Sequence, residues 1–389
     1  MIRRARALAL ACGLLLGSCF EGQALWGERC AADRDCGPAL TCHADGVCAD
    51  VPACGELPLT IADMRPKVVL LLDHSESMKR CLDAPEERSA CFDPDPPGPS
   101  RWDALAGVVQ AAVDGLADRV DFAAIVFPSD DLPDLLKQGY ACRFNAATTI
   151  AFGPTAAAAI EAAVPPDRDR EPSGENPVRD AWTAARALLD DVTGDAVPPR
   201  MIVLLTDNPP NCPGGGADLE TNTEKLDPSV ADLVAAGAAD GVPTLVVGIS
   251  IQDQLAGVVP GDGQIDLVNP NLYMTGLAEA GGAPQPGATP YLHLGDSDDL
   301  PGVTGALIAA IDALTADLGR CRVRLREAPE APELVAVGLD GRLRRDDPTC
   351  ADDQAWRWPG DDRRAIELCP GACARLTAGA GVRVRYGCP

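Results

Sequence analysis

The 389-residue chain is poor in aromatic side chains and in positive charge. Aromatic residues make up only 4% of a chain long enough for two or more domains, so aliphatic side chains must fill most of its core. Its 33 Lys and Arg residues against 58 Asp and Glu residues give a formal net charge of −25. A protein that binds nucleic acid needs a basic surface to neutralise the phosphates. The charge balance therefore argues against a nucleic-acid partner.

Histidine is also scarce, with only three residues in the chain. A Ser–His–Asp relay needs an imidazole within reach of a hydroxyl and an acid that orients the ring. His74 is adjacent to Ser75, but neighbouring side chains of an extended segment point apart. His43 lies in a cysteine-rich segment and His293 in an expected strand, so neither is placed for such a relay. We therefore expect that the protein is not an enzyme.

Long apolar runs are missing except near the N-terminus. Ala7–Leu16 follows three arginines and is too short to span a bilayer, which is typical of a signal peptide. The sequence Leu16-Gly17-Ser18-Cys19 resembles the bacterial lipobox, which implies that Cys19 is the lipid attachment site; an ordinary cleaved signal is the alternative. Phe20 stands where an Asp would resemble an inner-membrane retention signal. The resemblance thus implies a bacterial cell-envelope protein anchored by lipid, in the outer rather than the inner membrane, facing either side.

Cysteine, in contrast, is abundant, and its 16 residues are dispersed in a way that indicates disulfides formed in an oxidising compartment. If Cys12 leaves with the signal and Cys19 carries lipid, an even number remains. Between Cys30 and Cys54, five cysteines recur with five residues between neighbours. This segment has little apolar material, so disulfides must stabilise it. Zinc with His43 as a ligand is the alternative, but close C-x-x-C pairs are absent.

The middle of the chain alternates apolar strand-like runs with segments of helical spacing. Such alternation predicts an α/β fold, with a doubly wound, mostly parallel sheet covered by helices on both faces. Beyond Cys321, short strand-like runs and further cysteines predict a small disulfide-tied β module, with Asp340-Gly341 as a hairpin turn. The main expected strands are 68–72, 120–127, 200–205 and 242–249, and the main expected helices are 101–116, 178–190 and 228–239.

Short oxygen-bearing side chains follow two of these expected strands. Asp73, Ser75 and Ser77 come after the first strand, and Asp207 follows residues 200–205. Loops at the carboxyl ends of parallel strands open onto a common crevice where the strand order reverses. Carboxylate and hydroxyl oxygens are ligands for a hard divalent cation. The alternative for the first stretch alone is a Ser-rich turn that caps the next helix.

Residues 67 to 318 resemble a von Willebrand factor type A (VWA) domain. The D-x-S-x-S motif of that family matches Asp73, Ser75 and Ser77, residues 101–105 resemble the start of its first helix, and 201–207 resemble its fourth strand and distal aspartate. The resemblance implies a metal-ion-dependent adhesion site for a divalent cation, Mg²⁺ first, with Mn²⁺ or Ca²⁺ as alternatives. It also implies that a carboxylate of a protein ligand completes the coordination.

The sequence departs from the family pattern at several positions. Glu76 replaces a glycine between the two serines, and Asn208 replaces the glycine after the aspartate. The loop Gly174-Glu175-Asn176-Pro177 stands where the family supplies a threonine, so Asn176 is the expected ligand from that loop. The extra carboxylates of Glu76 and Glu175 either strengthen cation binding or repel an incoming carboxylate, and both alternatives stay open.

The expected metal ligands are thus Asp73, Ser75, Ser77, Asn176 and Asp207. Proximity in the implied fold suggests the disulfides Cys81–Cys91, Cys142–Cys212 and Cys321–Cys388. The expected segments are a signal peptide (1–18), a lipidated tether (19–29), a cysteine-rich module (30–54), a linker (55–66), the VWA domain (67–320) and the β module (321–389).

We expect a lipid-anchored envelope protein that binds a divalent cation and mediates metal-dependent adhesion or scaffolding. Its partner is an unidentified protein ligand, and it contacts the membrane through the lipid alone. The alternative is a metal-free structural envelope lipoprotein that acts through its cysteine-rich and C-terminal modules.

Overall fold

A computed structural model of the chain describes residues 26–37, 39–44, 46–60, 64–83, 91, 98–129, 141–164, 172–192, 196–213, 224–258, 265–339 and 341–387. The expected signal peptide and Cys19 lie outside the described residues. The chain divides into two compact units. Unit 1 comprises Met1–Met64, Gly194–Val197 and Asp317–Pro389, and unit 2 comprises Arg65–Thr193 and Pro198–Ala316.

Unit 2 is built on a five-stranded parallel sheet in the order β5-β4-β6-β7-β8. The central strands are almost wholly apolar and buried, as expected for strands covered on both faces. The chain runs from β4 to β5 on one side and then returns to β6 on the other, so the strand order reverses at β4 and β6. The strands are β4 (Lys67–Asp73), β5 (Asp121–Phe127), β6 (Arg200–Thr206), β7 (Thr244–Ile249) and β8 (Leu292–Leu294).

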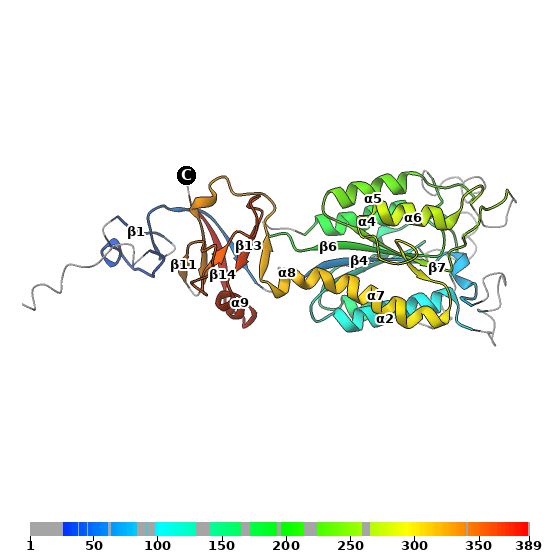
Figure 1. Cartoon of the computed structure of the whole chain (residues 1–389), viewed down its shortest axis with the longest axis horizontal. Coiled ribbons are helices and arrows are strands. Elements are labelled where there is room, and N and C mark those ends of the chain that lie inside the picture. Colours follow the sequence, from blue (N-terminus) through cyan, green and yellow to red (C-terminus); the bar gives the residue numbers. More distant parts are fainter. Residues whose placement is uncertain are drawn as a thin grey trace, which may run out of the picture. The chain divides into compact units, whose positions relative to one another are not determined.

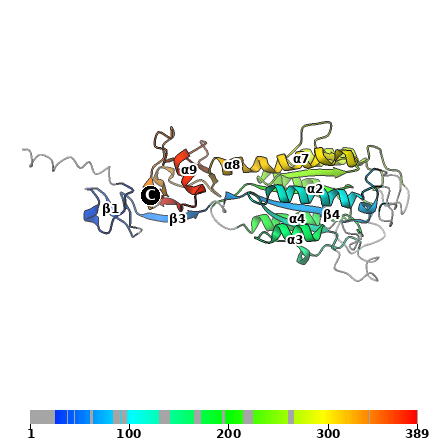
Figure 2. The same ribbon diagram turned by 90° about the horizontal axis from the view of Figure 1, so that it is seen from below.

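Helices cover both faces of this sheet (Figure 1). Helices α4, α5 and α6 pack on one face, and α2, α3 and α7 pack on the other, with α2 and α7 side by side (Figure 2). Residues of β4 alternate between the two cores, because successive side chains of a strand point to opposite faces. The doubly wound α/β fold predicted from the sequence is confirmed. The helices are α2 (Arg101–Leu116), α3 (Ala156–Ala163), α4 (Val178–Asp190), α5 (Ser229–Ala239), α6 (Pro270–Ala280) and α7 (Leu300–Asp312), followed by the short α8 (Ala316–Gly319).

Helix α2 has a well-defined start that matters for the site. The hydroxyl of Ser100 accepts from the backbone N–H of Asp103, and the Asp103 carboxylate accepts from the N–H of Ser100. This capping box makes Arg101 the first helical residue. The preceding insertion is closed by the expected Cys81–Cys91 disulfide, and Cys81 also forms a β-bridge with Ser100.

Unit 1 contains two small antiparallel sheets and one helix packed around a shared core. The first sheet has the order β11-β10-β14-β3 and the second has the order β12-β13-β9. The elements are β3 (Ala53–Leu59), β10 (Val335–Leu339), β11 (Arg342–Arg344), β14 (Val382–Gly387), β9 (Arg322–Arg324), β12 (Trp356–Arg357), β13 (Ala365–Leu368) and α9 (Pro370–Thr377), with β1 (Thr41–Cys42) and β2 (Cys48–Ala49) nearer the N-terminus.

Strand β3 corrects the expectation of a linker over residues 55–66. It pairs antiparallel with β14, so the segment joins the C-terminal sheet as its edge strand. Leu57 and Leu59 alternate inward and pack in the core of unit 1. Pro58 has no backbone N–H to donate, which an edge strand tolerates. The alternation is too short to reveal a strand when its partner lies more than 300 residues away.

The cysteine-rich segment belongs to the same unit and is closed by Cys30–Cys42 and Cys36–Cys48. Sulfur atoms of three of these residues lie within 4.8 Å of one another, but all are used in disulfides, which excludes the zinc alternative for them. The segment packs against the C-terminal sheet, since Val47 shares a small core with Ala336 and Leu343. The expected separate modules are therefore parts of one unit.

The C-terminal disulfides differ from expectation. Cys321 bonds Cys373, and Cys350 bonds Cys369, so the expected Cys321–Cys388 pair is wrong. The reason is α9, a helix that we did not predict from the sequence. Its Ala372 and Leu376 pack in the core of unit 1, and this places Cys373 beside the start of β9. Cys388 lies outside the described residues.

Candidate metal centre

The carboxyl ends of β4 and β6 meet at the point where the strand order reverses. Asp73 is the last residue of β4, and Thr206 is the last residue of β6, directly before Asp207. Both aspartates are almost fully buried. The sheet thus brings two carboxylates that are 134 residues apart in the sequence to one edge, where open α/β sheets place their ligands.

Asp73 is held by hydrogen bonds to both of its carboxylate oxygens. Its Oδ1 accepts from the backbone N–H of Ser75 at 2.8 Å, and its Oδ2 accepts from the hydroxyl of Thr206 at 2.6 Å. Burial and the nearby Asp207 charge raise the pKa of Asp73 to about 7, although these hydrogen bonds act in the opposite direction. Such a carboxylate needs a compensating positive charge.

The two serines of the motif face the second aspartate. After β4 the chain turns into a short 3₁₀ helix (Glu76–Lys79), which places the Oγ atoms of Ser75 and Ser77 3.1 Å apart. Ser77 donates to Asp207 Oδ1 at 2.8 Å. Two hydroxyl oxygens and two carboxylates therefore lie in one hydrogen-bonded cluster.

Asn176 joins this cluster from the loop before α4. Its Nδ2 donates to Thr206 Oγ1 at 3.1 Å and to the backbone oxygen of Asn208 at 3.2 Å. Its Oδ1 is buried and has no hydrogen-bond partner, whereas nearly all buried acceptors in proteins have one. An unpaired amide oxygen, on a side chain that shares the Thr206 hydroxyl with Asp73, is available as a cation ligand.

The loop that carries Asn176 is held in place on both sides. Gly174 has a φ of +83°, and a Cβ atom there would lie 2.7 Å from the backbone oxygen of Ala141. Its own oxygen accepts from the N–H of Glu76 at 3.0 Å. The expected Cys142–Cys212 disulfide is present and joins the segment beneath this loop to the one after Asp207.

All five expected metal ligands are thus brought together. Their oxygen atoms comprise hydroxyl, carboxylate and amide types, which suit a hard divalent cation such as Mg²⁺ or Mn²⁺. The unpaired Asn176 Oδ1 and the two buried carboxylates fit such an ion.

Arg101 is a residue of this site that sequence reasoning missed. Its Nη1 donates to Asp207 Oδ2 at 2.5 Å, and the exposed fractions of the two side chains are 3% and 0%. An arginine at the first position of a helix opposes the helix dipole. That unfavourable position, directly after a capping Ser100, is the feature of the sequence that sets this arginine apart, but it does not identify a buried partner.

The two extra carboxylates have partners of their own. The Glu76 side chain is 76% exposed and lies 4.0 Å from Lys79 Nζ. Glu175 accepts from Asn211 Nδ2 at 2.7 Å, and burial, together with the Glu76 and Glu224 charges, raises its pKa. The exposed Glu76 carboxylate is therefore accessible to an approaching ligand, whereas Glu175 is hydrogen-bonded to Asn211 in the loop after β6.

His74 packs as a core side chain. It is buried, and its ring meets Trp102 edge-on with 4.5 Å between the ring centroids. Its backbone N–H donates to Phe127 O at 2.6 Å, which ties the site loop to β5. The absence of enzymatic activity stays a prediction.

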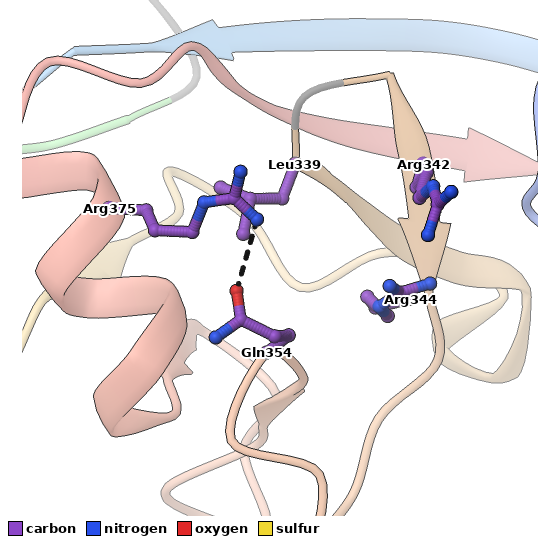
Figure 3. A pocket seen from close by; sticks show the side chains of 5 residues that line it. All are labelled: Leu339, Arg342, Arg344, Gln354 and Arg375. Carbon is purple, nitrogen blue, oxygen red and sulfur yellow. Dashed lines mark hydrogen bonds between the residues drawn. The ribbon is translucent and has the colours of Figure 1, made fainter.

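Unit 1 has a cavity of about 180 Å³, and the charged side chains that line it are all arginines (Figure 3). Its arginines already have partners in this unit: Arg342 pairs with Glu28, Arg344 lies 3.8 Å from Asp352, and Arg375 donates to Gln354. We therefore assign no ligand to it. The lining residues are Leu339, Arg342, Arg344, Gln354 and Arg375. Elsewhere, within the described part of the chain, no helix combines the length and apolarity needed to cross a membrane.

Neither a protein-family model nor a curated protein matches the chain. Solved structures that match include an aerotolerance-related membrane protein from Bacteroides fragilis NCTC 9343, at 16% identity and a TM-score of 0.36, over 64% of this chain and 98% of that one. The manganese-loaded TRAP protein of Plasmodium vivax matches at 12% identity and a TM-score of 0.36, over 67% and 76%. The SpRpn10 VWA domain matches at 10% identity and a TM-score of 0.34, over 62% and 94%. All three scores lie below 0.5, so the contacts described above, and not these likenesses, support the metal site.

Proposed function

We propose that unit 2 is a VWA domain that binds one divalent cation and mediates metal-dependent adhesion or scaffolding between proteins. The observation that carries this proposal is the unpaired, buried Oδ1 of Asn176, whose amide nitrogen shares the Thr206 hydroxyl with Asp73. Five oxygen-bearing side chains from three loops converge there with no apolar packing role. Such convergence has a cost in desolvation, which a bound cation offsets.

Each residue has a distinct part in this function. Ser75, Ser77 and Asn176 offer neutral oxygens, and Asp73 and Asp207 supply the negative charge. Thr206 orients two of these side chains at once through its hydroxyl. A bound divalent cation would supply a positive centre with room for a further oxygen ligand, such as a carboxylate of the partner protein.

Calorimetric titration of the purified protein with Mg²⁺, Mn²⁺ and Ca²⁺ tests the metal site. We expect one site per chain in the wild type and no binding in Asp73→Asn. Asp232→Asn is the matched control, because it removes one exposed carboxylate from α5 of the same unit. A flat trace for the folded wild type would contradict the proposal.

Adhesion and envelope location are tested separately. We propose a lipid anchor at Cys19 and a partner in the bacterial envelope, the outer membrane first. Metabolic labelling with palmitate should mark the wild type and not Cys19→Ala. Capture of partners from an envelope extract should be abolished by chelator and by Asp73→Asn, but not by Asp232→Asn. Capture that survives both would exclude metal-dependent adhesion.

A metal-free structural role is the second candidate, and one observation favours it. Arg101 already supplies a positive charge to Asp207 in the structure. A folded wild type that binds no cation in the titration, and that still captures its partners with chelator present, would support this candidate.

A further inference from the structure

The buried Arg101–Asp207 ion pair places a cation of the protein itself at the candidate metal site. The guanidinium occupies Asp207 Oδ2, while Ser77 donates to Oδ1, so both oxygens of this ligand have protein partners. The Nε atom of Arg101 is buried without a hydrogen-bond partner. Arg101 is therefore held by its ion pair with Asp207, while its Nε atom is left without a hydrogen-bond partner.

Arg101 changes the net charge of the site by one unit. Asp73 and Asp207 carry two negative charges when ionised, which a divalent cation alone would balance. With Arg101 present, the metal-free cluster carries one net negative charge, and the loaded cluster carries one net positive charge. Two cations that share a buried aspartate repel each other strongly, because the surroundings screen them poorly.

We propose that Arg101 is an internal competitor for the divalent cation, one that holds Asp207 in the metal-free protein and weakens metal binding. This inference rests on the proposed metal-binding function and adds a regulatory residue to it. Arg101 stabilises the empty site, so metal binds only by weakening or displacing the Arg101–Asp207 contact. The site is thereby set for a weak affinity that responds to the cation concentration around the protein.

The test compares Arg101→Met with the wild type by titration with Mn²⁺ and with Mg²⁺. We expect Arg101→Met to bind Mn²⁺ at least tenfold more tightly. Arg119→Met is the matched control, since it removes the 2.8 Å ion pair with Asp312 near the other end of α2. It should bind as the wild type does. Equal or weaker binding by Arg101→Met would overturn the inference.

A second readout does not depend on metal affinity. In chelator, thermal unfolding of Arg101→Met should begin at a lower temperature than that of the wild type, because Asp207 loses the positive charge that is paired with it. Added Mn²⁺ should raise the unfolding temperature of Arg101→Met more than that of the wild type. A similar metal-induced shift in both proteins would argue that Arg101 has a packing role alone.

Arg101→Gln provides the same comparison if Arg101→Met fails to fold, because it keeps a hydrogen-bond donor for Asp207 without the charge. The outcomes separate the two proposals. Wild-type binding without tighter binding in either variant sinks the inference and leaves the proposed function standing. Binding by the variants but not by the wild type supports the inference and contradicts metal binding as the function of the native protein. No binding by any protein rejects both.

Discussion

The hydroxyl of Thr206 connects the two halves of the site. It donates to Asp73 Oδ2 and accepts from Asn176 Nδ2, so it sets the orientation of a carboxylate and of an amide. It is fully buried at the end of β6. Because the side-chain oxygen of Asn176 points away from the bonded nitrogen, Thr206 determines where that oxygen is presented.

We predict that Thr206→Val weakens Mn²⁺ binding at least tenfold and lowers the free energy of unfolding by about 1–3 kcal/mol, the usual cost of unsatisfied buried partners. Titration calorimetry and urea unfolding measure the two effects. Thr183→Val is the control, because the Thr183 hydroxyl is exposed and bonds only its own helix backbone. Unchanged affinity in Thr206→Val would remove Thr206 from the site.

In unit 1, Glu367 is a buried carboxylate that is hydrogen-bonded to two arginines. Burial raises the pKa of this carboxyl, but hydrogen bonds from Arg322 and Arg357 outweigh that effect and hold the pKa below its usual range. A carboxylate whose folded pKa is lowered stabilises the fold above its unfolded pKa, and this contribution is lost as the pH falls through the folded value.

We therefore predict that unit 1 is acid-labile through Glu367. Glu367→Gln should destabilise the protein by about 1–2 kcal/mol at pH 7, the size of a partly exposed charged hydrogen-bond pair. The difference from the wild type should shrink as the pH falls below 4.5, the ordinary pKa of a glutamate, and through the lower pKa of Glu367 in the folded protein. Urea unfolding at several pH values measures it, and a difference that is constant with pH would contradict the assignment.

At the scale of the elements, the loop before α4 positions Asn176, and its backbone conformation depends on Gly174. Gly174 has a positive φ, and a Cβ atom added to it would lie only 2.7 Å from the backbone oxygen of Ala141. We predict that Gly174→Ala lowers the free energy of unfolding by about 2 kcal/mol or more and weakens Mn²⁺ binding, because Asn176 moves with the loop. Gly107→Ala in α2 has open space and should instead stabilise by up to about 1 kcal/mol.

Edge strand β3 gives a test of unit 1. Leu59 is 2% exposed and packs in the shared core, so Leu59→Ala should cost about 2–4 kcal/mol in thermal or urea unfolding. Leu272→Ala, on the exposed face of α6, should change stability by less than about 0.5 kcal/mol. Equal effects in the two variants would contradict the packing of β3 in unit 1 and favour the linker expected over residues 55–66.

Elements with strong local patterns were predicted from the sequence, and those that depend on distant partners were not. The runs of β4 and β6 are continuous and apolar, so their burial and the position of Asp73 and Asp207 at their ends followed directly. β3 and α9 have two inward apolar residues each, which is too little periodicity to recognise. Arg101 was missed because its partner is 106 residues away and its charge suits a solvent-exposed face equally well.

At the scale of the whole molecule, unit 2 is inserted in the chain between the N-terminal and C-terminal parts of unit 1, and the short segment Gly194–Val197 of unit 1 interrupts it. The sequence alternation revealed unit 2 as one body. It did not reveal that the N-terminal cysteine-rich segment and the C-terminal β module are one unit, because the contacts that connect them join residues far apart in the sequence. Among these contacts are the pairing of β3 with β14, the packing of Val47 and the ion pair of Glu28 with Arg342.

The crossed disulfides Cys30–Cys42 and Cys36–Cys48 have a mechanical consequence. If the proposed lipid anchor holds the N-terminus and the proposed protein partner holds unit 2, a pulling force between them runs along the chain through the cysteine-rich segment. The Cys30–Cys42 disulfide closes a loop with a sequence separation of 12 residues, so the chain within this loop does not extend under the force. In single-molecule extension, reduction of these bonds should release about 40 Å of additional chain at about 3.5 Å per residue. With both disulfides intact, the cysteine-rich segment would transmit the force without extending.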